Sequence, residues 1–271
     1  MSVTSETQWK QELCEIGRRI WLREYVAAND GNFSLRISEN EVLATPTGMS
    51  KGFLTPDMIC KVDMEANPLE GAYRPSSEIL IHLEIYRQRP DVKAVVHAHP
   101  PTATGFAAAG LSLQECVLPE VIVNLGGVPL CPYALPGSPE LPESLKDYLH
   151  QYDAFLLANH GAVTIGPDLF AAYYKMETIE HFAKILLTAR LLGGAQGLPT
   201  ERVQELYGLR ERFGLKHPAA PPVCVPRSPT CMGEDCPVCG VGEPSPAAAE
   251  GHTRELVERI TREVLQSLRS R

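Results

Sequence analysis

The 271-residue chain carries 25 Lys and Arg against 33 Asp and Glu, a formal net charge of −8. This balance argues against a nucleic-acid-binding protein, which needs a basic surface to displace counterions. No apolar run reaches the ~18 residues of a membrane-spanning helix, and the N-terminal segment lacks the basic and apolar regions of a secretory signal. We therefore expect a cytoplasmic globular protein with neither a membrane nor a nucleic-acid partner.

Periodic patterns in the N-terminal half predict a helix followed by a hairpin. Apolar residues over 9–20 recur at helical spacing. Alternation over 32–37, a short polar turn and the apolar segment 42–44 predict two antiparallel strands. A second helix is predicted to begin at Ser76 and Ser77, because serine caps helix N-termini well. Its apolar stripe is predicted to consist of Leu80, Leu83 and Tyr86.

The following segments predict two short buried strands and one long helix. Residues 94–99 and 154–158 are apolar runs of strand length. The long helix is predicted to begin at Pro167 and to end at Gly193 and Gly194. Because helices interleave with strands and an early hairpin is present, the sheet is not expected to be purely parallel.

Three histidines and one glutamate are candidate metal ligands. His97 and His99 lie two apart on a predicted strand, so both imidazoles face the same side. His160 follows the second buried strand in an Asn-His-Gly turn. Three imidazoles around one ion, with a position left open, are typical of catalytic zinc. Glu78 is a candidate for a displaceable fourth ligand.

Three loops rich in small polar residues are candidate anion sites. They are 30–32, 45–48 and 76–77, and such loops offer N–H and O–H donors to phosphate. Taken singly, each loop is better explained as a turn or a helix cap. Lys51 either adds positive charge to this site or is an exposed surface lysine.

Five short motifs stand in this order along the chain: Gly31-Asn32-Phe33-Ser34, Thr45-Pro46-Thr47-Gly48, Pro75-Ser76-Ser77-Glu78, His97-Ala98-His99 and Asn159-His160-Gly161. With these motifs, residues 10–216 resemble the class II aldolase/adducin family, and within it the branch of L-fuculose-1-phosphate aldolases. All five occur in the family's order.

The resemblance implies a fold, a cofactor and a reaction. The fold would be a three-layer α/β/α arrangement around a mixed, largely antiparallel sheet, assembled as a homotetramer. One Zn²⁺ per subunit would be held by His97, His99, His160 and Glu78, with Glu78 also acting as the base. The reaction would be reversible cleavage of a ketose 1-phosphate, preferably L-fuculose 1-phosphate, to dihydroxyacetone phosphate and L-lactaldehyde. The residues that would bind the substrate phosphate are Asn32, Thr47, Gly48, Ser76 and Ser77.

One position departs from the aldolase pattern. Glu120 stands where the aldolases carry a tyrosine that protonates the aldehyde oxygen, so Glu120 is the candidate proton donor. An acidic residue there also resembles the methylthioribulose-1-phosphate dehydratases. A dehydratase or a sugar-phosphate epimerase on the same zinc fold is therefore the alternative enzyme, and an adducin-like scaffold module is the alternative without activity.

The C-terminal residues differ in composition from the rest of the chain. Residues 217–251 hold eight of the chain's 23 prolines and are predicted to form an extended, disordered linker. The apolar residues of segment 252–271 fall on one helical face. A tether followed by such a helix resembles the encapsulation peptides of bacterial microcompartments, which implies shell proteins as partners and the compartment lumen as location. The linker cysteines, either solvated thiols or metal ligands, are Cys224, Cys231, Cys236 and Cys239.

Overall fold

The computed structural model describes residues 5–215. These residues belong to the first of the two units into which the chain divides, Met1–Pro226. The predicted linker over 217–251, its four cysteines and the predicted helix over 252–271 lie outside the described residues. Within the described part of the chain, no helix has the length and apolar character needed to span a membrane.

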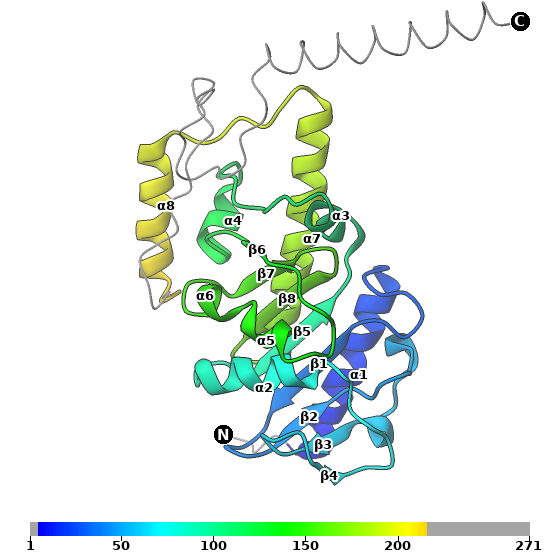
Figure 1. The fold of residues 1–271 in the computed structure, drawn as a ribbon. Coiled ribbons are helices and arrows are strands. Elements are labelled where there is room, and N and C mark those ends of the chain that lie inside the picture. Colours follow the sequence, from blue (N-terminus) through cyan, green and yellow to red (C-terminus); the bar gives the residue numbers. More distant parts are fainter. Residues whose placement is uncertain (1–4, 216–271) are drawn as a thin grey trace, which may run out of the picture. The chain divides into compact units, whose positions relative to one another are not determined.

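Helices and strands are interspersed along the described chain (Figure 1), and two 3-10 turns lie between β2 and β3. The N-terminal elements are α1 Glu6–Leu22, β1 Asn32–Arg36, β2 Val42–Ala44, η1 Lys51–Phe53, η2 Pro56–Met58, β3 Cys60–Val62, β4 Pro68–Glu70 and α2 Ile79–Gln88. The C-terminal elements are β5 Ala94–Ala98, α3 Pro101–Ala108, α4 Pro119–Asn124, β6 Leu130–Cys131, α5 Glu140–Glu143, α6 Lys146–Leu149, β7 Ala154–Leu157, β8 Gly161–Gly166, α7 Leu169–Leu191 and α8 Thr200–Arg212.

The strands of residues 5–215 form a single eight-stranded sheet in the order β4-β3-β2-β1-β5-β8-β7-β6. Neighbouring strands are antiparallel except for β6 and β7, which are parallel. The expectation of a mixed, largely antiparallel sheet is therefore confirmed. Because β5 pairs with both β1 and β8, it lies in the middle of the sheet.

Two apolar clusters, one on each face of the sheet, give the fold its three layers. Successive strand residues point to opposite faces, and Val95 and Val96 of β5 accordingly belong to different clusters. Helices α1, α3 and α7 contribute Ile16, Phe106 and Ile179 to the cluster that contains Val96. Helices α2, α5 and α6 supply the other cluster. The predicted α/β/α arrangement is confirmed.

Most predicted elements are present, and the differences have local causes. The helix predicted to begin at Ser76 and Ser77, α2, begins at Ile79, and Glu78 occupies its N-cap position. Ser76 Oγ accepts a hydrogen bond from the N–H of Glu78. Leu80, predicted to lie on the apolar stripe of this helix, is 38% exposed. Helix α7 is capped by Asp168, whose side chain accepts from Ala171 N. Strand β8, buried along its whole length, was not expected.

Candidate functional site

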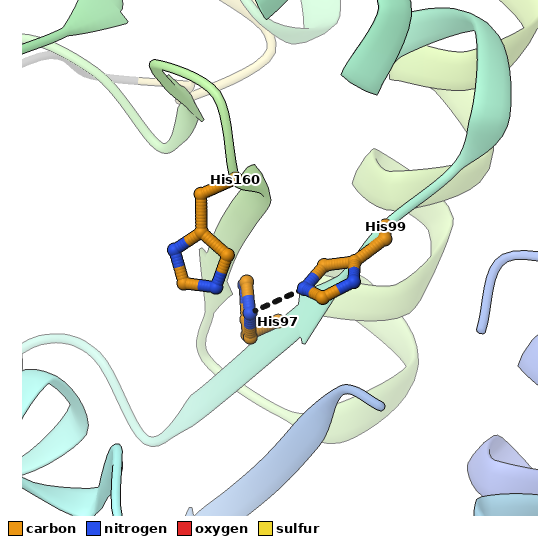
Figure 2. Close-up of side chains that lie close together, drawn as sticks. All are labelled: His97, His99 and His160. Carbon is orange, nitrogen blue, oxygen red and sulfur yellow. Dashed lines mark hydrogen bonds between the residues drawn. The ribbon is translucent and has the colours of Figure 1, made fainter. Parts of the chain in front are cut away.

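The three candidate histidines converge at one end of the central strands (Figure 2). His97 lies on β5, His99 follows that strand, and His160 occupies the turn between β7 and β8. Because β5 and β8 are antiparallel with Ala98 opposite Ala162, the residue before β8 lands beside the end of β5. One ring nitrogen from each histidine lies within 4.8 Å of the others. The topology thus brings together residues more than 60 positions apart.

A glycine allows β1 to approach the cluster. Gly31 has a φ of +74°, and a Cβ there would lie 2.6 Å from Val26 Cγ1 and 3.0 Å from the carbonyl oxygen of His97. Any larger residue would be strained and would also collide with β5. The next residue, Asn32, is paired with His97 in the sheet. Gly31 therefore lets Asn32 reach the histidine cluster.

The histidines are held in a form that suits metal coordination. His97 donates from Nδ1 to the carbonyl of Ala162 at 3.0 Å, which leaves the lone pair on Nε2. Burial lowers the pKa of His97 to about 3, so the ring is neutral near pH 7. Burial also lowers the pKa of His99, whose Nδ1 lies 3.5 Å from Asp30 Oδ2. A carboxylate behind a histidine is a common arrangement at metal sites.

Glu78 lies directly against the cluster. Its Oε2 is 3.3 Å from His97 Nε2, and its Oε1 is 3.2 Å from His160 Nε2. Burial acts to raise the pKa of Glu78, but its close contacts with His160, His97 and Asn32 outweigh burial and lower this pKa. Oε1 is buried, and apart from its 3.2 Å contact with His160 Nε2 no described residue donates a hydrogen bond to it. Converging imidazoles and a buried carboxylate oxygen beside them fit a divalent metal ion.

Four of the predicted phosphate-binding residues lie on two adjacent segments. Thr47 donates its N–H to the carbonyl of Arg74, and Ser76 donates its N–H to the carbonyl of Thr45. These hydrogen bonds place Thr47 and Gly48 beside Ser76 and Ser77, immediately before Glu78. Thr47, Gly48 and Ser77 are exposed. The fifth residue, Asn32, is buried and directs its amide toward Glu78 at 2.7 Å.

Two further candidate residues, Lys51 and Glu120, do not line the histidine cluster. The Lys51 ammonium is buried and donates to the carbonyls of Asn29 and Met49, so it is not the exposed lysine considered above. Glu120 is exposed in the first turn of α4. It lines a pocket of about 400 Å³ together with Arg23, His181 and Lys184. Among the described residues, none of the cluster histidines lines that pocket.

Sequence reasoning missed a set of buried polar residues behind Glu78. His82, on α2, is 1% exposed and contacts Asn32 and Ser34. Ser34 also contacts Tyr86. One signal was available, since residues four apart share a helix face and Glu78, His82 and Tyr86 follow that spacing. Asp30 was likewise considered only as part of an anion loop.

Comparisons with known proteins agree with this geometry. The family model "Class II Aldolase and Adducin N-terminal domain" matches residues 11–187. A 3-oxo-tetronate 4-phosphate decarboxylase of Pectobacterium atrosepticum is 38% identical over 189 residues, 68% of this chain and 86% of the relative. An L-fuculose phosphate aldolase of Methanococcus maripaludis is 37% identical over 174 residues, 64% of this chain and 93% of the relative.

A solved structure extends the agreement to the fold. The structure of an L-fuculose 1-phosphate aldolase is similar to this chain with a TM-score of 0.70 and 30% sequence identity, and the match covers 79% of this chain and 98% of the other. Decarboxylation and aldol cleavage both break a carbon–carbon bond, so the two curated relatives share the lyase class. The chain therefore belongs to the class II aldolase and adducin family and is an enzyme of the lyase class.

Proposed function

We propose that the chain is a zinc-dependent aldolase that reversibly cleaves a ketose 1-phosphate, preferably L-fuculose 1-phosphate, to dihydroxyacetone phosphate and L-lactaldehyde. One observation carries the proposal: the carboxylate of Glu78 lies 3.2 Å and 3.3 Å from the Nε2 atoms of His160 and His97. A base beside a metal-binding cluster is what deprotonation next to a carbonyl requires.

His97, His99 and His160 would hold one Zn²⁺ per subunit, with Glu78 as a displaceable fourth ligand. The ion would supply Lewis-acid stabilisation of the negative charge that develops on the substrate oxygens. Glu78 takes the proton from the carbon next to the carbonyl in the direction of synthesis and returns it in cleavage. Asn32, which donates to Glu78 at 2.7 Å, orients this carboxylate.

The exposed segments beside Glu78 would bind the phosphate. Thr47, Gly48, Ser76 and Ser77 offer backbone N–H and hydroxyl donors. Binding energy from this non-reacting end of the substrate helps to position the reacting carbon. Asn32 was predicted as a fifth phosphate ligand; its amide nitrogen already donates to Glu78, which favours the orienting role.

A second reaction is supported by the 38% identity to a 3-oxo-tetronate 4-phosphate decarboxylase. Loss of CO₂ from the carbon next to the ketone of that compound leaves the enediolate of dihydroxyacetone phosphate. Cleavage of a ketose 1-phosphate between its third and fourth carbons leaves the same enediolate. The same phosphate loops and the same Glu78 therefore serve both substrates, and the leaving group alone differs.

The deciding experiment offers zinc-loaded protein L-fuculose 1-phosphate and 3-oxo-tetronate 4-phosphate in separate assays. Release of dihydroxyacetone phosphate with L-lactaldehyde supports the aldolase, whereas its release with CO₂ supports the decarboxylase. L-Ribulose 5-phosphate and methylthioribulose 1-phosphate are included, because consumption of either without dihydroxyacetone phosphate would replace both proposals by an epimerase or a dehydratase. Protein that binds no zinc would contradict the metal assignment.

Two proposals on assembly rest on the family resemblance and on the C-terminal sequence pattern. We propose that the protein forms a homotetramer, which light scattering tests directly.

We also propose that residues 252–271 bind microcompartment shell proteins, so that the enzyme works in the compartment lumen. The apolar helical face and the tether that the sequence predicts there support the second proposal.

A further inference from the structure

A continuous line of short polar contacts leads from Glu78 into the core. Asn32 Nδ2 lies 2.7 Å from Glu78 Oε2, and Asn32 Oδ1 lies 2.6 Å from His82 Nε2. His82 Nδ1 lies 2.7 Å from Ser34 Oγ, which in turn lies 2.7 Å from the hydroxyl of Tyr86. Four contacts thus connect five side chains.

Two periodicities place these side chains opposite one another. Asn32 and Ser34 are two apart on β1 and share a face of the sheet. His82 and Tyr86 are four apart on α2, one turn after Glu78. Ser34, His82 and Tyr86 are each at most 1% exposed, so water does not compete for their hydrogen bonds.

The ionised carboxylate determines the direction of every hydrogen bond in this line. A carboxylate only accepts hydrogen bonds, so the amide nitrogen of Asn32 must face Glu78 and its oxygen must face His82. His82 must then carry its proton on Nε2 and accept from Ser34 at Nδ1. Burial, which lowers the pKa of His82 to about 4, keeps this ring neutral with a single proton.

We propose that His82 is a positioning residue: its Nε2–H holds the Asn32 amide so that Asn32 binds Oε2 of Glu78 and leaves Oε1 free for the metal. This inference rests on the proposed role of Glu78 as metal ligand and base. Without the His82 bond, the Asn32 amide can rotate and present its oxygen to Glu78, which repels the carboxylate. Glu78 then loses its fixed orientation toward the histidine cluster.

Two substitutions separate this role from simple packing. In His82→Gln the amide nitrogen lies near the position of Nε2 and can still donate to Asn32. In His82→Asn the shorter side chain reaches only the position of Nδ1. We expect zinc affinity and kcat to fall by roughly 10–100-fold in His82→Asn with KM little changed, and to be largely retained in His82→Gln. His150→Asn, on an exposed residue, is the matched control.

The wild-type protein provides a test that needs neither turnover nor a variant. ¹⁵N NMR of the full-length, zinc-loaded protein with labelled histidine reports which ring nitrogen of His82 is protonated. A neutral ring protonated at Nε2 is expected, and protonation at Nδ1 would overturn the proposal. Equal zinc affinity in His82→Asn and the wild type would overturn it as well. If the wild type turns over none of the sugar phosphates, the proposed function fails, whereas the NMR and zinc-affinity results still decide the role of His82.

Discussion

A methyl group on Gly161 would lie 2.5 Å from Cδ2 of His99 and 2.6 Å from the carbonyl oxygen of Ala98. Carbon atoms do not approach so closely without a shift of the backbone or the ring. Gly161 is the first residue of β8 and directly follows His160. Its missing side chain therefore provides the space in which the ring of His99 meets the other two histidines.

Gly161→Ala is expected to weaken zinc binding by at least about tenfold, because the added methyl group displaces His99 or the start of β8. Isothermal titration with Zn²⁺ measures the effect. Gly208→Ala is the control, since a Cβ at Gly208 meets no atom within 4 Å. Equal zinc affinity in the two variants would show that the cluster tolerates the methyl group.

Glu78→Gln is expected to leave the fold and most of the zinc in place while turnover falls by about 10²–10⁴-fold. The amide keeps the shape of the carboxylate but cannot take up a proton. The comparison combines zinc content, circular dichroism and steady-state rates. Glu84→Gln, on the same helix, serves as the control and is expected to keep its activity; near-normal turnover in Glu78→Gln would mean that another group is the base.

The buried ammonium of Lys51 is expected to make the free energy of unfolding depend on pH. Burial lowers its pKa from 10.5 to about 8, with Asp30 acting weakly in the opposite direction. Between pH 8 and 10.5 the unfolded chain holds this proton and the folded chain does not, so the free energy of unfolding rises with pH by up to about 3 kcal/mol from this group.

The test compares the wild type with Lys51→Met by urea unfolding from pH 7 to pH 10.5. The stability difference between the two proteins should shift in favour of the wild type as the pH rises, because the cost of burying the ammonium disappears. Lys93→Met, at an exposed lysine, is expected to show no such shift. A constant difference between wild type and Lys51→Met would mean that the buried ammonium stays charged throughout.

Much of the site could be predicted from the sequence because its residues lie on strongly periodic segments. His97 and His99 stand two apart on an apolar strand, and His160 stands in a turn with Asn159 at a φ of +56°. Only the family resemblance implied that the three side chains meet; their spacing could not show it, since the meeting depends on β8 pairing with β5. Strand β8 was missed because glycines bracket it and because burial of both faces removes the alternation that marks a strand.

The contacts among the buried polar residues behind Glu78 could not be predicted from the sequence for a different reason. The spacing of Asn32 and Ser34 and that of His82 and Tyr86 are both visible in the sequence. What the sequence does not show is that α2 packs on the face of β1 that carries Asn32 and Ser34. Lys51 was misjudged for a related reason, since two backbone carbonyls supplied by the fold satisfy its ammonium.

Substitution of Glu120 is expected to distinguish the two proposed reactions. Aldol cleavage requires a group that takes the proton from the hydroxyl that becomes the aldehyde, whereas decarboxylation has no such hydroxyl proton to remove. If Glu120 is that group, Glu120→Gln lowers aldol cleavage by about 10²–10⁴-fold and leaves decarboxylation unchanged. Glu140→Gln, also an exposed residue in a first helical turn, is the control. Full aldolase activity in Glu120→Gln would remove Glu120 from the chemistry.

Residues 252–271 are expected to direct the enzyme to its location in the cell and not to take part in catalysis. The sequence predicts a helix whose apolar residues share one face. A short isolated helix is only marginally stable in water, so a partner surface is expected to cover that face. Deletion of residues 250–271 should therefore leave kcat and KM unchanged and abolish co-purification with shell proteins. Ile260→Asp, which places a charge in the middle of the apolar face, should have the same effect without shortening the chain. Undiminished co-purification of both variants would show that the segment does not bind the shell, and a loss of activity would instead indicate that it docks on the enzyme itself.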